Sequence, residues 1–353
     1  MTHSSDYPKK LLLIDGNAIM HRAYHALPAL TNKDGQLTNA VYGFLSMLLS
    51  ITDKLKPTHL IVCFDRPEPT FRKQMYVGYQ AHRPKMEDGL SSQFALVKEA
   101  VSAMNIPIYE QAGFEADDVI GTLAWQATHL PSFPRKRESH KIPDQVGDDN
   151  TQELMNVVIV TGDRDILQLV NDTVYVYMPV SGLNNGKLYT SKEVVEKFGI
   201  TPPQIVDYKA LAGDASDNYP GVRGIGPKTA SELLKKYGTV EGIYNTIRSK
   251  DPKILRSKEK TIKALSEYAE DAAMAKKLAK ILHDVPVTID IEKAKLHDFD
   301  TPEALEVLQK FGFASLVKRV MGVEESKDPK IQRIKDPNKK RKENNDSEQL
   351  SLV

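Results

Sequence analysis

The sequence has little cysteine, no long apolar run and almost no net charge. Its 353 residues include one cysteine, Cys63, which excludes an intramolecular disulfide framework and fits a reducing cytosol. No stretch approaches the roughly 18 apolar residues of a membrane span, and residues 1–6 are too polar for a signal-peptide core. A formal net charge of +1 indicates no class of charged partner by itself. We therefore expect a cytoplasmic protein with no membrane partner.

Three apolar runs of strand length are followed by aspartate. They are residues 11–14 with Asp15, residues 60–64 with Asp65, and residues 157–160 with Asp163 and Asp165. Continuous apolar runs are typical of strands buried on both faces, and a helical pattern at 39–55 separates the first two. This alternation predicts an α/β fold with a parallel-type central sheet flanked by helices. Because such sheets bind ligands at the carboxyl ends of their strands, we expect the four aspartates at one edge.

A second acidic group opens the predicted helix that continues to Trp125. Glu115, Asp117 and Asp118 lie within four residues, which is more than a favourable interaction with the helix dipole requires. Packing this helix against a core would crowd like charges, and a cation would relieve the repulsion. The strand-end aspartates and this triplet are hard oxygen ligands, so they favour Mg²⁺ or Mn²⁺ over zinc. Taken alone, the triplet could also be a solvated acidic helix start.

Residues 66–85 interleave basic and aromatic side chains. Proteins hold single-stranded nucleic acid in this way, with cations along the phosphates and rings stacked on the bases. A solvated basic loop would have the same composition. Because the segment directly follows Asp65, we expect it to serve the same substrate as the carboxylates.

Residues 213–230 combine an acidic pair with a glycine hairpin. Asp214 and Asp217 stand three residues apart, and Gly224 and Gly226 lead into a helix with Pro227 in its first turn, where proline is favoured. Exposed backbone N–H groups at such a hairpin, backed by a helix N-terminus, bind phosphate without reading bases.

The chain divides into three expected parts: an α/β core at 8–190, a helical region at 191–323 and a flexible basic tail at 324–353. Residues 131–150 interrupt the core. They are polar, contain prolines and have no periodicity, so we interpret them as a disordered insertion.

Taken in order, these motifs resemble those of the 5′ nucleases of the flap endonuclease family, and most closely the 5′–3′ exonuclease domain of bacterial DNA polymerase I. The resemblance covers residues 10–323 and rests on Leu13-Ile14-Asp15-Gly16, Phe64-Asp65, Phe71-Arg72, Glu115-Ala116-Asp117-Asp118, Thr161-Gly162-Asp163-Arg164-Asp165 and the run from Gly213 to Ala230. It implies a PIN-like fold with a helical arch at 66–90 over the active site. It also implies a helix–hairpin–helix at 221–229 that grips duplex DNA.

The resemblance further implies roles for individual residues. Two or more divalent ions, Mg²⁺ or Mn²⁺ in its place, would be held by nine carboxylates: Asp15, Asp65, Glu115, Asp117, Asp118, Asp163, Asp165, Asp214 and Asp217. DNA contacts would come from Lys73, Tyr76, Tyr79, His82 and Lys85 of the arch and from Gly221, Val222, Gly224, Ile225, Gly226, Lys228 and Thr229 of the hairpin, where a K⁺ ion is also expected. Bacterial relatives typically have lysine where this chain has Gln80, so Arg72 and Arg83 are the expected catalytic cations.

The function implied is that of a metal-dependent, structure-specific 5′ nuclease, both 5′–3′ exonuclease and flap endonuclease, which removes primers and flaps from DNA in replication and repair. Two ions about 4 Å apart would activate water and stabilise the in-line transition state without a protein nucleophile. We interpret the sequence as having no polymerase part of its own, and whether a separate DNA polymerase is a partner stays open.

Three alternatives compete with this function. An aspartyl-phosphate hydrolase would need a second aspartate two residues after Asp15, and that position is Asn17. A DNA-junction-binding protein with weak or lost catalysis is supported by Gln80 alone. RNA stays open as a substrate because ribonucleases with similar acidic sites exist, although the hairpin at 221–229 favours duplex DNA.

Apolar residues reappear at positions 349–353, after the basic tail. Gln349, Leu350, Leu352 and Val353 resemble the short motif with which bacterial DNA-processing proteins bind the sliding clamp, with Val353 where an aromatic residue or leucine is more usual. An exposed motif on a flexible tether is a common recognition mode. We therefore expect the sliding clamp as a partner.

Overall fold

The computed structural model describes residues 9–129, 155–181, 185–249 and 259–323, which are built on a six-stranded sheet. The strands are β1 (Lys10–Asp15), β2 (His59–Cys63), β3 (Ile108–Tyr109), β4 (Asn156–Val160), β5 (Val174–Ser181) and β6 (Asn185–Tyr189). Their order is β3-β2-β1-β4-β5-β6, and all neighbours are parallel except β5 and β6. The predicted α/β class is confirmed. The predicted insertion at 131–150 and the tail with its clamp motif lie outside the described residues.

Alternate side chains of each inner strand pack into two cores, one on each face of the sheet. Leu12 and Ile14 of β1 belong to one core, whereas Leu11 and Leu13 belong to the other. The helices of the first face are α1 (Gly16–Ala26), α2 (Asn39–Leu55), α4 (Asp88–Ser91), α5 (Gln93–Ala103), α15 (Pro302–Lys310) and α16 (Ala314–Val320). The second face is covered by α6 (Ala116–His129), η1 (Asp165–Leu169) and α7 (Ser191–Phe198). Burial of the strands on both faces explains their continuous apolar runs. Helix α2 has the bounds predicted from the helical pattern at 39–55.

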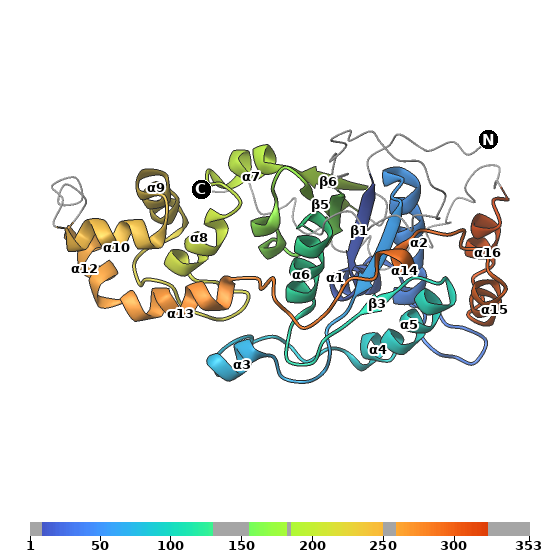
Figure 1. The fold of residues 1–353 in the computed structure, drawn as a ribbon. Coiled ribbons are helices and arrows are strands. Elements are labelled where there is room, and N and C mark those ends of the chain that lie inside the picture. The colour runs from blue at the N-terminus through green and yellow to red at the C-terminus, as the bar shows by residue number, and fades with distance from the viewer. Residues whose placement is uncertain (1–8, 130–154, 182–184, 250–258, 324–353) are drawn as a thin grey trace, which may run out of the picture.

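A helical region lies at one end of the sheet, on the left in Figure 1. It consists of α8 (Gln204–Ala212), α9 (Pro227–Tyr237), α10 (Val240–Arg248), α12 (Glu259–Glu267) and α13 (Ala269–Ala279). From α13 the chain returns along α6 to α14 (Ile291–Ala294). Three side chains spaced four residues apart on α6 accept hydrogen bonds from backbone N–H groups of this returning segment. The pairs are Asp118 with Leu282, Thr122 with Val285 and Gln126 with Ile289. This return ties the helical region to the helix that begins at the acidic triplet.

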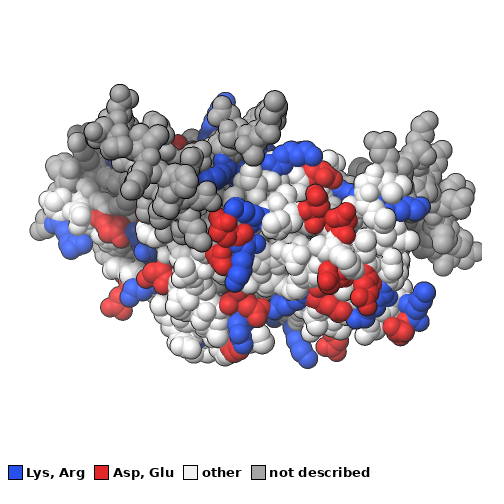
Figure 2. Space-filling view, turned by 45° about the vertical axis from the view of Figure 1, so that its right-hand side comes forward, with Lys and Arg blue, Asp and Glu red and all other residues white. Residues whose placement is uncertain are grey.

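Cys63 is buried in β2, and burial raises the pKa of its thiol. On the face shown in Figure 2, acidic and basic side chains are interspersed, in keeping with a net charge near zero. Among the described residues, no helix is both long enough and apolar enough to cross a bilayer.

Candidate metal centre

The carboxyl edge of the sheet holds the strand-end aspartates. Because β1 lies between β2 and β4, Asp15 is central, with Asp65 on one side and Asp163 on the other. One oxygen of Asp15 accepts from the Ala18 N–H at 2.9 Å and so caps α1, the ordinary role of such an aspartate. The other oxygen accepts from Thr161 Oγ1 at 2.6 Å, which ties the end of β1 to the loop after β4.

The start of α6 adds Asp117 to this edge. Asp65 Oδ1 accepts from the Ala116 N–H at 2.6 Å, which joins the loop after β2 to the helix. Burial raises the pKa of Asp117 well above its ordinary value, and the negative charges of Asp163 and Asp15 raise it further. Asp117 therefore lies near enough to the strand-end aspartates for their charges to act on it.

This edge carries more negative charge than its surroundings compensate. Burial raises the pKa of Asp15 to about 7, and the charges of Asp65 and Asp163 add to the effect. Burial, followed by the charge of Asp163, likewise raises the pKa of Asp165 to about 7. Carboxylate oxygens crowded in this way are the donors that Mg²⁺ and Mn²⁺ prefer, and a divalent cation would favour their charged form. The residues present therefore fit a divalent ion.

Asp165, Asp214 and Asp217 form a second carboxylate group, with one oxygen from each within 4.8 Å of the others. The Asp165 N–H donates to Asp163 Oδ1 at 2.8 Å, so the second group adjoins the strand-end aspartates. The Lys209 ammonium lies between Asp165 and Asp214 and donates to both. Packing of α8 against η1 thus unites carboxylates that lie far apart in the sequence.

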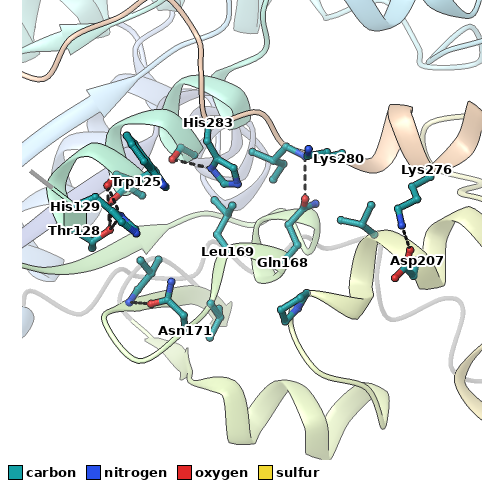
Figure 3. Close-up of a pocket in the computed structure, with 17 residues that line it drawn as sticks. Trp125, Thr128, His129, Gln168, Leu169, Asn171, Asp207, Lys276, Lys280 and His283 are labelled. Atoms are coloured by element: carbon teal, nitrogen blue, oxygen red, sulfur yellow. Dashed lines mark hydrogen bonds and ion pairs between the residues drawn. The ribbon is translucent and has the colours of Figure 1, made fainter. Parts of the chain in front are cut away.

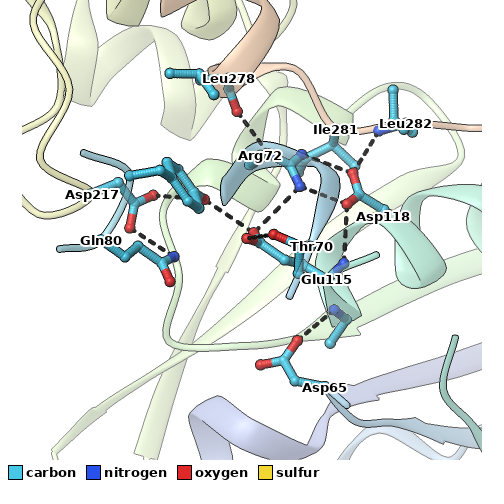
Figure 4. A network of polar contacts seen from close by, with 12 residues as sticks. Asp65, Thr70, Arg72, Gln80, Glu115, Asp118, Asp217, Leu278, Ile281 and Leu282 are labelled. Carbon is cyan, nitrogen blue, oxygen red and sulfur yellow. Dashed lines mark hydrogen bonds and ion pairs between the residues drawn. The ribbon is translucent and has the colours of Figure 1, made fainter. Parts of the chain in front are cut away.

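Asp118 points away from this edge, into a buried ion pair with Arg72 (Figure 4). Its two oxygens accept from Arg72 Nη1 at 2.6 Å and Nη2 at 2.8 Å, and one also accepts from the Leu282 N–H at 3.0 Å. The Arg72 guanidinium further donates to the carbonyls of Leu278 and Lys280. Arg72 is only 2% exposed and Asp118 is fully buried.

This burial conflicts with the expectation that Asp118 binds metal and that Arg72 touches the substrate. The ion pair instead helps to position Glu115, whose carboxylate lies 3.3 Å from Arg72 Nη1. The Glu115 carboxylate also accepts hydrogen bonds from Thr70 Oγ1 and the Tyr79 hydroxyl. Successive helix residues point about 100° apart, so only part of an acidic triplet can face one edge. We infer a positioning role for Arg72 and Asp118.

Residues 66–90 are helical only over α3 (Phe71–Met75) and α4, so a helical arch is not formed along the whole segment. Lys73, His82 and Lys85 are exposed, and Tyr76 is partly exposed. These four predicted DNA-contacting residues therefore remain accessible to a ligand.

Tyr79 is buried instead of being presented to bases. Its ring stacks on Tyr219 with 6.3 Å between centroids, and its hydroxyl donates to Asp217 Oδ2 at 3.3 Å. Gln80 Nε2 and Arg83 Nη2 donate to the other oxygen of Asp217 at 3.1 and 3.3 Å. Base stacking predicted for Tyr79 does not fit this structure, in which residues 79–83 close over the second carboxylate group.

The glycine hairpin lies between α8 and α9, but only part of it is accessible. Val222 and Ile225 are buried in the core, and a Cβ on Gly221 would come within 2.3 Å of the Gly213 nitrogen. These three predicted DNA-contacting residues thus serve packing. Gly224, Gly226 and Lys228 are exposed and Thr229 is partly exposed. The accessible backbone is therefore the Gly224–Gly226 turn at the start of α9.

Sequence reasoning missed Lys209, Tyr219 and Asn17. Asn17 Oδ1 accepts from the Asp65 N–H at 3.0 Å and so holds the loop after β2. The Tyr219 hydroxyl is buried with no hydrogen-bond partner among the described residues. The sequence did contain a signal that Lys209 belongs to the site. Lys209 is the one charged residue in the stretch 208–213, which directly precedes Asp214.

A cavity of about 430 Å³ lies away from the carboxylates, beside the second half of α6 (Figure 3). Trp125 stacks on His129 at its wall with 4.8 Å between centroids, and Gln168 and His283 also line it. None of the nine predicted metal ligands lines this cavity. The candidate metal centre is therefore identified by its clustered carboxylates and not by this cavity.

Two family models match the chain. The 5′–3′ exonuclease N-terminal resolvase-like domain matches residues 10–133, and the 5′–3′ exonuclease C-terminal SAM fold matches residues 200–302. The 5′–3′ exonuclease of Aquifex aeolicus is 36% identical over 312 residues, which cover 88% of this chain and 95% of that protein. The chain belongs to the 5′–3′ exonuclease family.

Longer proteins also match. DNA polymerase I of Bacillus caldotenax is 39% identical over 312 residues, which cover 88% of this chain and 32% of the relative. The chain spans about a third of the length of such relatives. Among solved structures, the bacteriophage T5 flap endonuclease in a complex with DNA and metal ions has a TM-score of 0.58 at 17% identity, covering 89% of this chain and 99% of that one. This likeness shows that the chain shares the fold of the T5 structure.

Proposed function

We propose that the chain is a divalent-metal-dependent, structure-specific 5′ nuclease that cleaves DNA, as a 5′–3′ exonuclease and flap endonuclease in replication and repair. The observation that carries the proposal is the convergence of carboxylates from the ends of β1, β2 and β4, the start of α6 and the loop after α8. DNA as the substrate is supported by structural relatives described as complexes with DNA, from bacteriophage T5 and from the catalytic core of Rad2. A cytoplasmic location and a separate DNA polymerase partner accompany this proposal.

Two or more Mg²⁺ ions, or Mn²⁺ in their place, are the proposed cofactors. Asp15, Asp65, Asp117 and Asp163 would hold one, and Asp165, Asp214 and Asp217 would hold another, with Glu115 beside them. When bound, such ions activate water and stabilise charge on the phosphate.

The chain's own residues would bind and orient the DNA. The exposed cations of residues 73–85 would follow the phosphates of the 5′ strand. Among them, Arg83 is exposed and lies 3.3 Å from Asp217 of the second carboxylate group. The Gly224–Gly226 turn, with a K⁺ ion, and Lys228 would hold the duplex. These contacts go to phosphates, so recognition would depend on junction shape and not on base sequence.

A cleavage assay with 5′-flap, nicked, blunt duplex and single-stranded DNA tests the proposal. With Mg²⁺ or Mn²⁺ we expect the flap and nicked substrates to be cut fastest, and a chelator to stop cleavage. An RNA flap included in the same series tests the alternative substrate. Absence of cleavage with both ions, despite tight flap binding, would overturn the proposal.

That outcome would favour the second candidate, a DNA-junction-binding protein with weak or lost catalysis. Gln80 supports it, because a cation typical of relatives is missing there. The buried carboxylates argue against it, because crowded like charges are costly to retain without a cation.

Gln80→Lys is expected to raise the cleavage rate. Gln80 Nε2 lies 3.1 Å from Asp217 Oδ1, so a side chain at this position reaches the second carboxylate group. The new lysine would restore a cation near the scissile phosphate. One charge-assisted hydrogen bond to this phosphate contributes about 1.5–3 kcal/mol, which corresponds to roughly a tenfold or larger rise in turnover. Single-turnover cleavage of a saturating 5′-flap substrate measures the effect. Gln80→Met, of similar length without charge, is the control, and a rate for Gln80→Lys at or below that of the unaltered chain would contradict the expectation.

Removal of residues 349–353 is expected to eliminate binding to the cognate sliding clamp without changing cleavage of a free flap. The motif Gln349, Leu350, Leu352 and Val353 would insert its apolar side chains into a clamp pocket, with the tail as a tether. Calorimetry with the full-length and truncated chains measures the affinity. Equal affinities would remove the clamp from the proposed partners.

A further inference from the structure

Lys209 occupies the position where the carboxylates of the second group converge. It lies in the last turn of α8 with its side chain 14% exposed, and its ammonium donates to both Asp165 and Asp214. An oxygen of Asp217 also lies within 4.8 Å of these oxygens, so Lys209 bridges two members of a three-carboxylate group, and Arg83 donates to the third.

The remaining oxygens of Asp214 and Asp217 are also hydrogen-bonded by the protein. The other oxygen of Asp214 accepts from the N–H and hydroxyl of Ser216, and Asp217 accepts from residues 79–83. At the strand ends, by contrast, the bonds that Asp15 accepts come from neutral donors on Ala18 and Thr161. The two halves of the candidate metal centre therefore differ: among the described residues, Lys209 and Arg83 donate directly to the second group, whereas Asp15 accepts from neutral donors.

We propose that Lys209 is an internal counter-ion, which holds Asp165 and Asp214 together in the metal-free protein and leaves them when a divalent ion binds. This inference rests on the proposed function, because it takes the second group to be an ion site. An ion of the Mg²⁺ type needs carboxylate oxygens at about 2.0–2.1 Å, and the ammonium is bonded to these same oxygens. Two cations sharing them would repel each other.

Lysine is suited to such an exchange. Its charge is a compact ammonium on a flexible four-carbon stem, so the head can move away from the carboxylates without movement of α8. In the metal-free protein the ammonium removes repulsion between Asp165 and Asp214. The same contact lowers the apparent affinity for a metal ion, because the ion binds only after Lys209 has left. Lys209 thus stabilises the metal-free fold while weakening metal binding.

Lys209→Met tests the exchange without DNA and without an activity readout. Titration of the full-length chain with Mn²⁺, followed by electron paramagnetic resonance, is expected to show about tenfold tighter binding at one of the two ion sites in this variant. Its melting temperature without metal should fall and should recover more with Mn²⁺ than that of the unaltered chain.

Lys276→Met is the matched control. Lys276 of α13 also bridges two carboxylates, Asp207 at 2.6 Å and Glu241 at 2.7 Å, but this group does not belong to the candidate metal centre. The control should lower the melting temperature and leave the Mn²⁺ affinities unchanged. Equal affinities in Lys209→Met and the unaltered chain, or weaker binding in the variant, would overturn the proposal.

Trace acetylation of the unaltered chain gives an independent readout that needs no variant. The acetylation rate of Lys209, followed by mass spectrometry, should rise when Mn²⁺ is added, while that of Lys276 in the same sample should not. Two bound ions with an unchanged rate at Lys209 would overturn this inference alone. Failure of Mn²⁺ to bind to the unaltered chain and to Lys209→Met would instead overturn the proposed ion site, and the inference with it.

Discussion

Asp163→Asn should abolish Mg²⁺-dependent cleavage of a 5′ flap and leave binding of the flap largely intact. The asparagine keeps the shape of the side chain and an oxygen that can accept from the Asp165 N–H, now at 2.8 Å, so the loop after β4 should fold unchanged. It removes one negative charge from the carboxylates that would hold the ion. We expect a loss larger than the roughly 10–100-fold that removal of a supporting contact costs.

Single-turnover cleavage and fluorescence anisotropy of a labelled flap separate the two effects. Asp117→Asn, from the start of α6, should behave in the same way, because it faces the same strand ends. Asp172→Asn is the control, since this exposed residue follows η1 and lies outside both carboxylate groups. Full activity of Asp163→Asn and Asp117→Asn would show that the metal centre is wrongly assigned.

Arg72→Met should lower the free energy of unfolding by about 3–5 kcal/mol, because it leaves the buried Asp118 carboxylate without its cation. The methionine fills part of the space but cannot donate to Asp118 or to the Leu278 and Lys280 carbonyls. Urea unfolding followed by circular dichroism measures the change. A double variant with Asp118→Leu should be less destabilised than Arg72→Met, because it no longer buries an unpaired charge.

Arg66→Met is the control for the loss of an arginine from the same loop. Arg66 pairs with Glu68 at 2.6 Å, but both side chains are largely exposed, so we expect a change of only about 0–1 kcal/mol. If Arg72→Met unfolded at the same urea concentration as the unaltered chain but cleaved poorly, Arg72 would be a catalytic cation after all.

The α/β class and the convergence of Asp15, Asp65 and Asp163 could be predicted because they depend on local sequence patterns. Apolar runs of strand length identify the strands, and an aspartate just after a run must lie near its carboxyl end. In a parallel sheet these ends share one edge, so strand identity and direction suffice to bring the residues together.

The direction of each acidic side chain on α6 could not be predicted in the same way. Asp117 faces the strand ends, whereas Asp118 faces Arg72 and the chain returning past Leu282. Adjacent residues of a helix point about 100° apart, so the outcome depends on how α6 is rotated against the sheet. The segments that set this rotation lie far from α6 in the sequence.

The sequence by itself thus determined three strands of the sheet, the carboxylates at their ends and the family to which the chain belongs. Only the tertiary structure decided that Lys209 bonds to Asp165, 44 positions away, and that Arg83 reaches Asp217, 134 positions away. A charged side chain on a helix or loop carries no local signal of its partner, because the partner depends on which surfaces the apolar cores bring together. The partners of Lys209 and Arg83 in the second carboxylate group therefore depend on how α8, η1 and residues 79–83 pack together.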